Sequence, residues 1–240
     1  YSGEKLTTIK ANKEILLSAG SIGSPHILQV SGIGEKQKLN NYGIDVIHEL
    51  KGVGKNLQDH LMFRPVYKVK NLKSLNGKIN SLLGNLLIGM EYIFNQSGPM
   101  TMGASQVCGF LKSDSSRATP NLQFHVQPIS TDILGATKMH DFDGITPTIA
   151  NIRPTSRGEI NITSGDSRDN PKIKMNYLST QDDRDVAAKS LKIVRKIMLE
   201  TEAFKKYEPE EYRPGIHITE DEELVQAGSE HTQTIFHPVG

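Results

Sequence analysis

His237, close to the end of the chain, is the residue best suited to acid–base chemistry. It stands in the run Phe236-His237-Pro238-Val239-Gly240. An imidazole titrates near neutral pH, so a positioned histidine can take the proton of a hydroxyl group as that group reacts. A lone histidine is more often a surface or core residue, and Pro238 by itself only marks a turn. The role of His237 therefore depends on the rest of the sequence.

The remaining histidines and the cysteine predict no metal site. His60 follows Asp59, which we interpret as a structural polar pair, with a functional pair as the alternative. His231 is interpreted as a surface residue or a support for His237. Cys108, the only cysteine, rules out an internal disulfide and a multi-cysteine metal site. Five further histidines show no metal-ligand spacing, namely His26, His48, His125, His140 and His217.

A glycine-rich segment near the N-terminus is suited to contact a ligand. An apolar run leads into the turn Ala19-Gly20-Ser21, followed by Ser24 as a helix N-cap and Pro25 at the first helical position. Such a turn lets a backbone approach a ligand closely, and the helix N-terminus offers free N–H groups to an anion. An ordinary strand–helix connection is the alternative interpretation.

Four segments in order resemble the glucose–methanol–choline (GMC) flavoprotein oxidoreductases. The first is Gly20, Ser24-Pro25, Ile27-Leu28 and Ser31-Gly32-Ile33-Gly34; the second is Val53-Gly54-Lys55-Asn56-Leu57-Gln58-Asp59-His60. The third is Pro154-Thr155-Ser156-Arg157-Gly158, with Asn170-Pro171 and Asn176-Tyr177 after it; the fourth is the His237 run. The resemblance spans nearly the whole chain, is weakest over 62–145, and is closest in style to insect glucose-dehydrogenase-like members.

This resemblance implies an FAD-dependent oxidoreductase that acts on the CH–OH group of an alcohol or sugar. His237 would be the base, hydride would pass to flavin N5, and Ala19, Gly20 and Ser21 would lie by the cofactor. A quinone or oxygen would then accept the electrons. Two alternatives stay open: a hydroxynitrile-lyase-type enzyme with structural FAD, and a cofactor-less binding or structural relative.

Two features of the family pattern are missing from these residues. The Gly-x-Gly-x-x-Gly fingerprint that holds a dinucleotide pyrophosphate is not present, nor is a second active-site His or Asn beyond His237. We therefore expect an internal fragment of a longer protein that is inactive alone. If a signal peptide precedes this fragment in the full-length protein, the protein would be secreted.

The segments fit an α/β part joined to an α+β part, that is, part of a Rossmann-like FAD-binding domain with an antiparallel-sheet substrate-binding domain. Expected strands cover 6–11, 14–18, 44–50, 122–126, 159–163 and 172–177; expected helices cover 26–31, 35–42, the second half of 72–94, and a stretch opening at Thr180. Residues 135–146 are expected to be a loop. The expected division is 1–61 as the end of the FAD-binding region, 62–150 as a substrate-domain region, and 151–240 as the truncated C-terminal domain.

Composition narrows the classes of partner. The chain has 28 Lys+Arg against 27 Asp+Glu, a formal charge of +1, which argues against nucleic acid or an acidic membrane surface as partner. No apolar run approaches the roughly 18 residues of a membrane span. With 36% hydrophobic and 23% charged residues, the sequence predicts a globular protein with a packed core.

Overall fold

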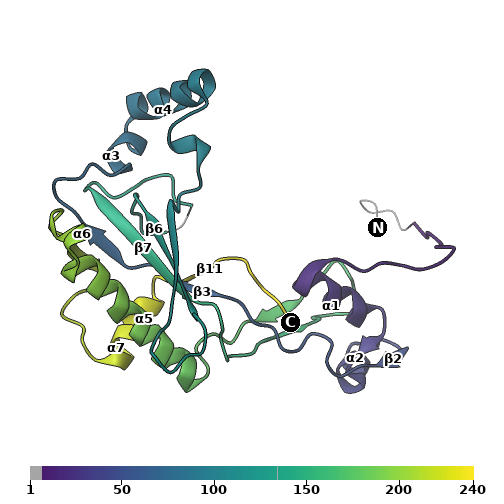
Figure 1. Cartoon of the computed structure of the whole chain (residues 1–240). Coiled ribbons are helices and arrows are strands. Elements are labelled where there is room, and N and C mark those ends of the chain that lie inside the picture. The colour runs from purple at the N-terminus through teal and green to yellow at the C-terminus, as the bar shows by residue number, and fades with distance from the viewer. Residues whose placement is uncertain (1–6, 134) are drawn as a thin grey trace. The chain divides into compact units, whose positions relative to one another are not determined.

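The computed structural model describes residues 7–133 and 135–240, which form two compact units (Figure 1). Unit 1 contains residues 7–57, Gly158–Lys174 and Val239–Gly240; unit 2 contains Gln58–Arg157 and Met175–Pro238. Both units are therefore discontinuous in sequence. The division expected from the sequence, into 1–61, 62–150 and 151–240, refers to regions of the family pattern and not to compact units. It stays a prediction.

Unit 1 is small and mixed in secondary structure. Its elements are α1 (Gly20–Val30), β1 (Ile33–Gly34), α2 (Lys36–Asn41), β2 (His48–Glu49), β8 (Glu159–Asn161) and β9 (Lys172–Lys174). Strands β1 and β2 pair in parallel, and β8 and β9 form the expected antiparallel hairpin. The helix expected at 35–42 is confirmed as α2, whereas the strand expected at 44–50 is reduced to β2.

The start of α1 differs from the prediction. The helix begins at Gly20, so Pro25 lies inside it and Ser24 is not the N-cap. Instead, the Ser24 hydroxyl accepts a hydrogen bond from the Ala19 backbone N–H at 3.0 Å. Gly20 has a φ of +76°, a left-handed conformation that favours glycine. This glycine allows the chain to turn into the helix several residues earlier than the Ser-Pro pair suggested.

The two N-terminal strands were predicted wrongly where they can be checked. Residues 7–18 carry no strand, and Ile15 and Leu16 are 82% and 80% exposed. An apolar run becomes a strand only when a neighbouring strand satisfies its backbone groups. No described residue pairs with this run. Residue 6 of the first expected strand lies outside the described residues.

Gln29 joins two of the sequence motifs within unit 1. Its buried side-chain amide donates to the Ile160 carbonyl and accepts from the Ile162 N–H, each at 2.9 Å. Gly54 approaches the same place: a Cβ there would lie 2.2 Å from the Ile160 oxygen. Its φ of +77° also favours glycine. These motif residues therefore hold the β8–β9 hairpin.

Unit 2 is built on one antiparallel sheet. Its strands are β3 (Leu61–Phe63), β4 (Val66–Lys68), β5 (Val107–Leu111), β6 (Leu122–Gln127), β7 (Gly144–Asn151), β10 (Glu210–Arg213) and β11 (Gln233–Thr234). The order runs β10-β4-β7-β3-β11, and β6 pairs with both β7 and β5. Its helices are α3 (Asn76–Ile79), α4 (Leu82–Asn95), η1 (Pro99–Thr101), α5 (Gln181–Glu200), α6 (Glu202–Lys205) and α7 (Asp221–Ser229).

The core of unit 2 lies between the sheet and α5. Val186, Leu191 and Val194 of this helix are buried with strand residues such as Leu122 and Ile149. Figure 1 shows α5 and α7 together against the sheet. The predicted helix start is confirmed, because the Thr180 hydroxyl accepts from the Asp183 N–H as an N-cap. Sheet and helix together confirm the expected α+β part.

Strand β7 was not among the expected strands, and it contains Pro147. A proline cannot donate to a ladder, so it usually marks an edge strand. Here β7 is central and nearly all buried. On one side, β7 pairs with β4 at residues 144–145 and with β3 at residues 149–150. Residues 146–148 have no partner on that side among the described residues. Pro147 lies at this gap, and the loop expected at 135–146 instead ends where β7 begins at Gly144.

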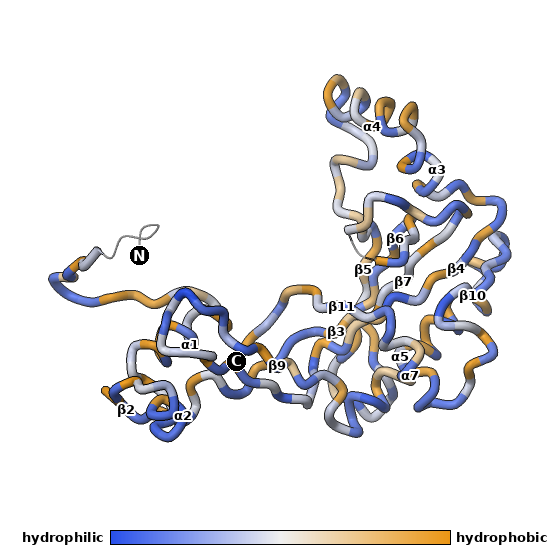
Figure 2. Tube along the Cα trace, turned by 180° about the vertical axis from the view of Figure 1, so that it is seen from behind, coloured by the Kyte–Doolittle hydropathy of each residue, from blue (hydrophilic) through white to orange (hydrophobic). Residues whose placement is uncertain are grey.

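Helix α4 confirms the helix expected in the second half of 72–94. It has no buried residue, and the trace of the helix in Figure 2 is orange at its apolar residues. Leu82, Ile93 and Phe94 are among the most exposed. At 14 residues, α4 is short of a bilayer crossing, and among the described residues no helix reaches the length and hydropathy that spanning requires.

Candidate functional site

Asp59 anchors the segment that carries His237. One carboxylate oxygen accepts the His237 backbone N–H at 2.9 Å. The other accepts the Tyr177 hydroxyl at 2.6 Å and also the Thr234 hydroxyl. Three segments far apart in sequence therefore meet at one buried carboxylate, and this contact fixes the backbone of His237.

Hydrogen bonding keeps this carboxylate ionised. Burial alone would raise the pKa of Asp59, but the hydrogen bonds from Thr234, Tyr177 and backbone amides outweigh it and hold the pKa below its usual value. Burial, followed by the bond to Asp59, raises the pKa of Tyr177. The tyrosine is therefore a stable proton donor to the carboxylate.

The backbone just before His237 is in an unusual conformation. Phe236 has a φ of +60°, in the left-handed region that bulky residues rarely adopt. Its N–H donates to the Thr234 hydroxyl at 2.9 Å, and the Ile235 N–H donates to the His60 carbonyl at 3.4 Å. Strain of this kind often accompanies functional positions, where surrounding contacts maintain it. The His237 ring remains exposed.

His60 lies directly against the His237 ring. The two Nδ1 atoms are 3.3 Å apart, and the rings meet edge to face with centroids 5.4 Å apart. Burial lowers the pKa of His60, and proximity to His237 lowers it further, while Asp59 and a backbone hydrogen bond to Ile152 oppose this. The sequence-based choice of a structural pair for Asp59-His60 misses this contact with His237.

His125 on β6 is a further neighbour that the sequence did not single out. Burial, then the charge of His237, lowers its pKa, so the two rings are within electrostatic reach. Its cross-strand partner Thr148 shares its face of the sheet, as does Gln127 two residues on. Three buried polar atoms have no partner among the described residues: Arg64 Nε, Gln127 Oε1 and Thr148 Oγ1. Two of these atoms, Gln127 Oε1 and Thr148 Oγ1, therefore lie on the same face of the sheet as His125.

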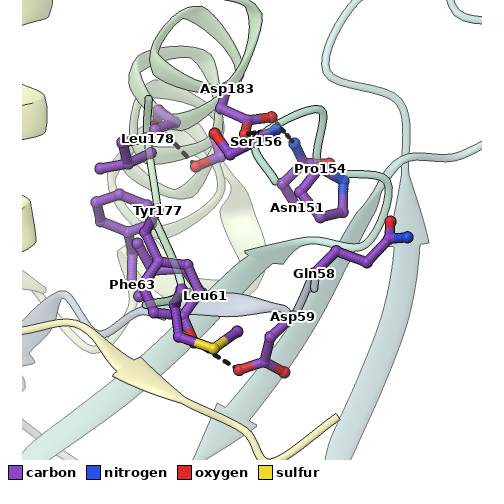
Figure 3. Close-up of a pocket in the computed structure, with 13 residues that line it drawn as sticks. Gln58, Asp59, Leu61, Phe63, Asn151, Pro154, Ser156, Tyr177, Leu178 and Asp183 are labelled. Carbon is purple, nitrogen blue, oxygen red and sulfur yellow. Dashed lines mark hydrogen bonds between the residues drawn. The ribbon is translucent and has the colours of Figure 1, made fainter. Parts of the chain in front are cut away.

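Asp59 also lines a small pocket (Figure 3). Its wall includes Phe63, Tyr177 and the buried Asp183, which accepts backbone N–H groups of Thr155 at 2.9 Å and Ser156 at 2.8 Å. In Figure 3 the Tyr177 hydroxyl points to Asp59, while Asp183 binds the loop between β7 and β8. These contacts tie Asp59 to the frame of unit 2.

The structure places the other predicted site residues in unit 1. Ala19 is the N-cap of α1, and Gly20 and Ser21 begin the helix. A Cβ at Gly20 would meet nothing within 4 Å, and the first turn of α1 contains no acidic residue. His237 belongs to unit 2, so the two parts of the predicted site lie in separate units. The described residues contain no group of three or more potential metal ligands of the His, Cys, Asp and Glu types.

Acid should release the His237 segment only below the usual carboxylate range. Because the folded pKa of Asp59 is depressed, its stabilisation is complete above the unfolded pKa of about 3.9 and is lost as pH falls through the folded value. Hydrogen exchange of residues 233–237 measures this, with Tyr177→Phe as the matched variant. Loss of the Tyr177 hydroxyl, one of the donors to Asp59, should move the midpoint of this transition to a higher pH. Protection that already falls between about pH 7 and 5 in the wild type would contradict this assignment.

Comparison with known proteins decides the family. The GMC oxidoreductase family models match residues 2–62 and 154–240. The chain belongs to the GMC oxidoreductase family. It is 38% identical over 240 residues to the oxygen-dependent choline dehydrogenase of Pectobacterium atrosepticum, covering 99% of this chain and 42% of that protein. Against the Proteus mirabilis protein of the same name, identity is 38% over 232 residues, covering 97% and 41%. The chain thus spans less than half of these relatives.

Solved structures support the same fold for this GMC chain. A formate oxidase superposes with a TM-score of 0.86 at 24% identity, covering 96% of this chain and 44% of the other. An FAD-dependent oxidoreductase from Chaetomium thermophilum gives 0.82 at 23%, covering 98% and 46%. These likenesses confirm the expected fold class, an α/β part with an antiparallel-sheet part.

Proposed function

We propose that the full-length protein is an FAD-dependent oxidoreductase acting on the CH–OH group of an alcohol, with His237 as the base. The arrangement around His237 carries this proposal: its ring is exposed, its backbone is fixed by Asp59, and His60 contacts its Nδ1. An imidazole held in this way can accept a hydroxyl proton near neutral pH. Asp59 and Tyr177 would keep it in place while it does so.

The residues of this chain fit contacts with FAD. Gly20 leaves open space at an uncapped helix start, which suits an anionic or flat group. In the part of the chain that the structure describes, three buried polar atoms have no hydrogen-bond partner: Arg64 Nε, Gln127 Oε1 and Thr148 Oγ1. They suit a ligand that has both hydrogen-bond donors and acceptors, and the isoalloxazine ring and alcohols both have them. When bound, FAD supplies the oxidant, which takes a hydride from the alcohol carbon and leaves a carbonyl. Ala19, Gly20 and Ser21 would lie by this cofactor.

The substrate is proposed as a small alcohol, with choline and glucose as the first compounds to test. Choline follows from the names of the 38% identical relatives. Glucose follows from the insect glucose-dehydrogenase-like style of the motifs, a finer assignment that stays a prediction. The electron acceptor would be a quinone or oxygen.

Product analysis tests the reaction class. Full-length protein loaded with FAD should convert an alcohol to its carbonyl compound in the presence of a quinone-type dye or oxygen, with one acceptor equivalent reduced for each carbonyl formed. Supply of each acceptor separately distinguishes a dehydrogenase from an oxidase. Cleavage of a cyanohydrin without reduction of any acceptor would instead establish a lyase and contradict the proposal.

A further inference from the structure

The contact between His60 and His237 restricts where their protons can lie. Their Nδ1 atoms are 3.3 Å apart, so one must donate and the other must accept. Two lone pairs facing each other would repel, and two N–H groups would clash. The pair therefore has one of two proton arrangements, and the surroundings of His60 decide between them.

The surroundings favour His60 as the acceptor. Burial and the neighbouring His237 lower the pKa of His60, so this ring is neutral near pH 7 and carries one N–H. The backbone of Ile152 raises the pKa of the same ring, which is the effect of a carbonyl oxygen that accepts a ring N–H. The Ile152 N–H already donates to the Asn121 carbonyl at 2.9 Å, so the Ile152 carbonyl is the group that can receive the single proton of His60. Since Nδ1 faces His237, the nitrogen that carries this proton is Nε2, and Nδ1 presents a lone pair.

We infer that His60 is a positioning residue that fixes the tautomer of His237, so that His237 donates through Nδ1–H and presents Nε2 as the nitrogen that accepts the substrate proton. This rests on the proposed function of His237. Two backbone contacts keep the rings in register: the His237 N–H to Asp59, and the Ile235 N–H to the His60 carbonyl. A neutral imidazole has only one lone pair on its ring nitrogens, so the choice of tautomer decides whether the exposed ring can act as a base.

The other titratable groups around this pair do not supply the same function. Asp59 accepts the His237 backbone N–H and the Tyr177 hydroxyl, so its oxygens are directed to those donors. His125, from β6, acts on His237 through charge and has no hydrogen bond to it. Among the described residues, His60 is the one whose side chain contacts Nδ1 of His237.

The test reads the tautomer directly in the full-length protein with FAD bound. Ring ¹⁵N-labelled histidine gives separate NMR shifts for protonated and unprotonated nitrogens, and a His237→Ala spectrum assigns the signals. We expect wild-type His237 to carry its proton on Nδ1 with Nε2 unprotonated at neutral pH. A His237 ring protonated on Nε2 and not on Nδ1 would overturn the inference, and the protonation itself is read in the wild-type protein.

Two variants of His60 add a functional readout. His60→Asn keeps an acceptor near the position of Nδ1, whereas His60→Leu removes it. With His60→Leu we expect the Nδ1–H tautomer of His237 to become the minor form and flavin reduction to slow by about 10-fold, which is less than the 10²–10⁴-fold contribution of the whole acid–base group. His60→Asn should restore both, and the exposed His217→Leu should change neither. An unchanged tautomer in a folded His60→Leu protein overturns the inference. If His237→Ala reduces flavin at the wild-type rate, it is the proposed function that fails.

Discussion

Replacing His237 by alanine should slow reduction of the bound flavin by about 10²–10⁴-fold, because a positioned acid–base group contributes that much to a proton transfer. The backbone N–H of residue 237 would still donate to Asp59, so the segment should keep its conformation. Flavin content and thermal stability should therefore stay close to those of the wild type. Stopped-flow measurement of flavin absorbance under anaerobic conditions gives the rate.

His231→Ala is the matched control for this experiment. It removes a histidine from the same C-terminal part of unit 2 without touching the contacts of Asp59. Added imidazole should partly restore the His237→Ala enzyme, since the native ring is exposed and its place is open to solvent. A loss of less than about threefold in His237→Ala would be far below the contribution of an acid–base group and would remove its assigned role.

Replacing Glu211 by alanine should give the largest loss of stability, about 3–5 kcal/mol, because it leaves a buried guanidinium without its carboxylate. Arg195 binds both Glu211 oxygens, at 2.8 and 2.9 Å, and the side chains are 13% and 0% exposed. The Tyr67 hydroxyl donates to the same carboxylate at 3.3 Å. This cluster joins β10 and β4 to α5, so its loss should loosen one edge of the sheet.

The neighbouring Glu210 provides a control for the stability prediction. Its carboxylate is 4.0 Å from Lys68 Nζ and 71% exposed, so Glu210→Ala should cost no more than about 1 kcal/mol. The double replacement Arg195→Leu with Glu211→Leu should recover part of the loss, since no unpaired charge remains. Urea unfolding of the full-length protein measures the free energy of unfolding of all three variants: Glu211→Ala, Glu210→Ala and the double replacement. Equal effects at positions 210 and 211 would show that the buried pair does not hold this edge.

Local signals in the sequence were sufficient for some elements. Thr180 with acids behind it predicts the start of α5, and period-two alternation predicts the β8–β9 hairpin; both are confirmed. Each of these features is decided by residues close in sequence. The family resemblance is also confirmed, because its motifs depend on residue types at fixed short spacings.

Elements that depend on distant partners were harder to predict. Residues 14–18 have the apolar composition of a buried strand, yet no described neighbour pairs with them. Strand β7 is central despite Pro147, because the break between β3 and β4 removes the need for an N–H there. The periodicity of the sequence shows neither the missing partner of residues 14–18 nor the break between β3 and β4.

The Asp59 contacts illustrate why the site was only partly predicted. Asp59, Tyr177 and His237 each stand in a motif that the sequence analysis quoted, but their hydrogen bonds span 118 and 178 positions. Spacing along the chain does not tell which side chain meets which. The contact between His60 and His237, 177 positions apart, likewise required the fold.

The most direct test of the central claim is anaerobic mixing of the full-length, FAD-loaded protein with candidate alcohols while flavin absorbance is followed. The proposed function predicts that choline, glucose or another alcohol bleaches the flavin, and that a new acceptor restores its colour. A protein that retains FAD but is not reduced by any alcohol, while it cleaves a cyanohydrin, would contradict the account. A full-length protein that binds no FAD would contradict it as well.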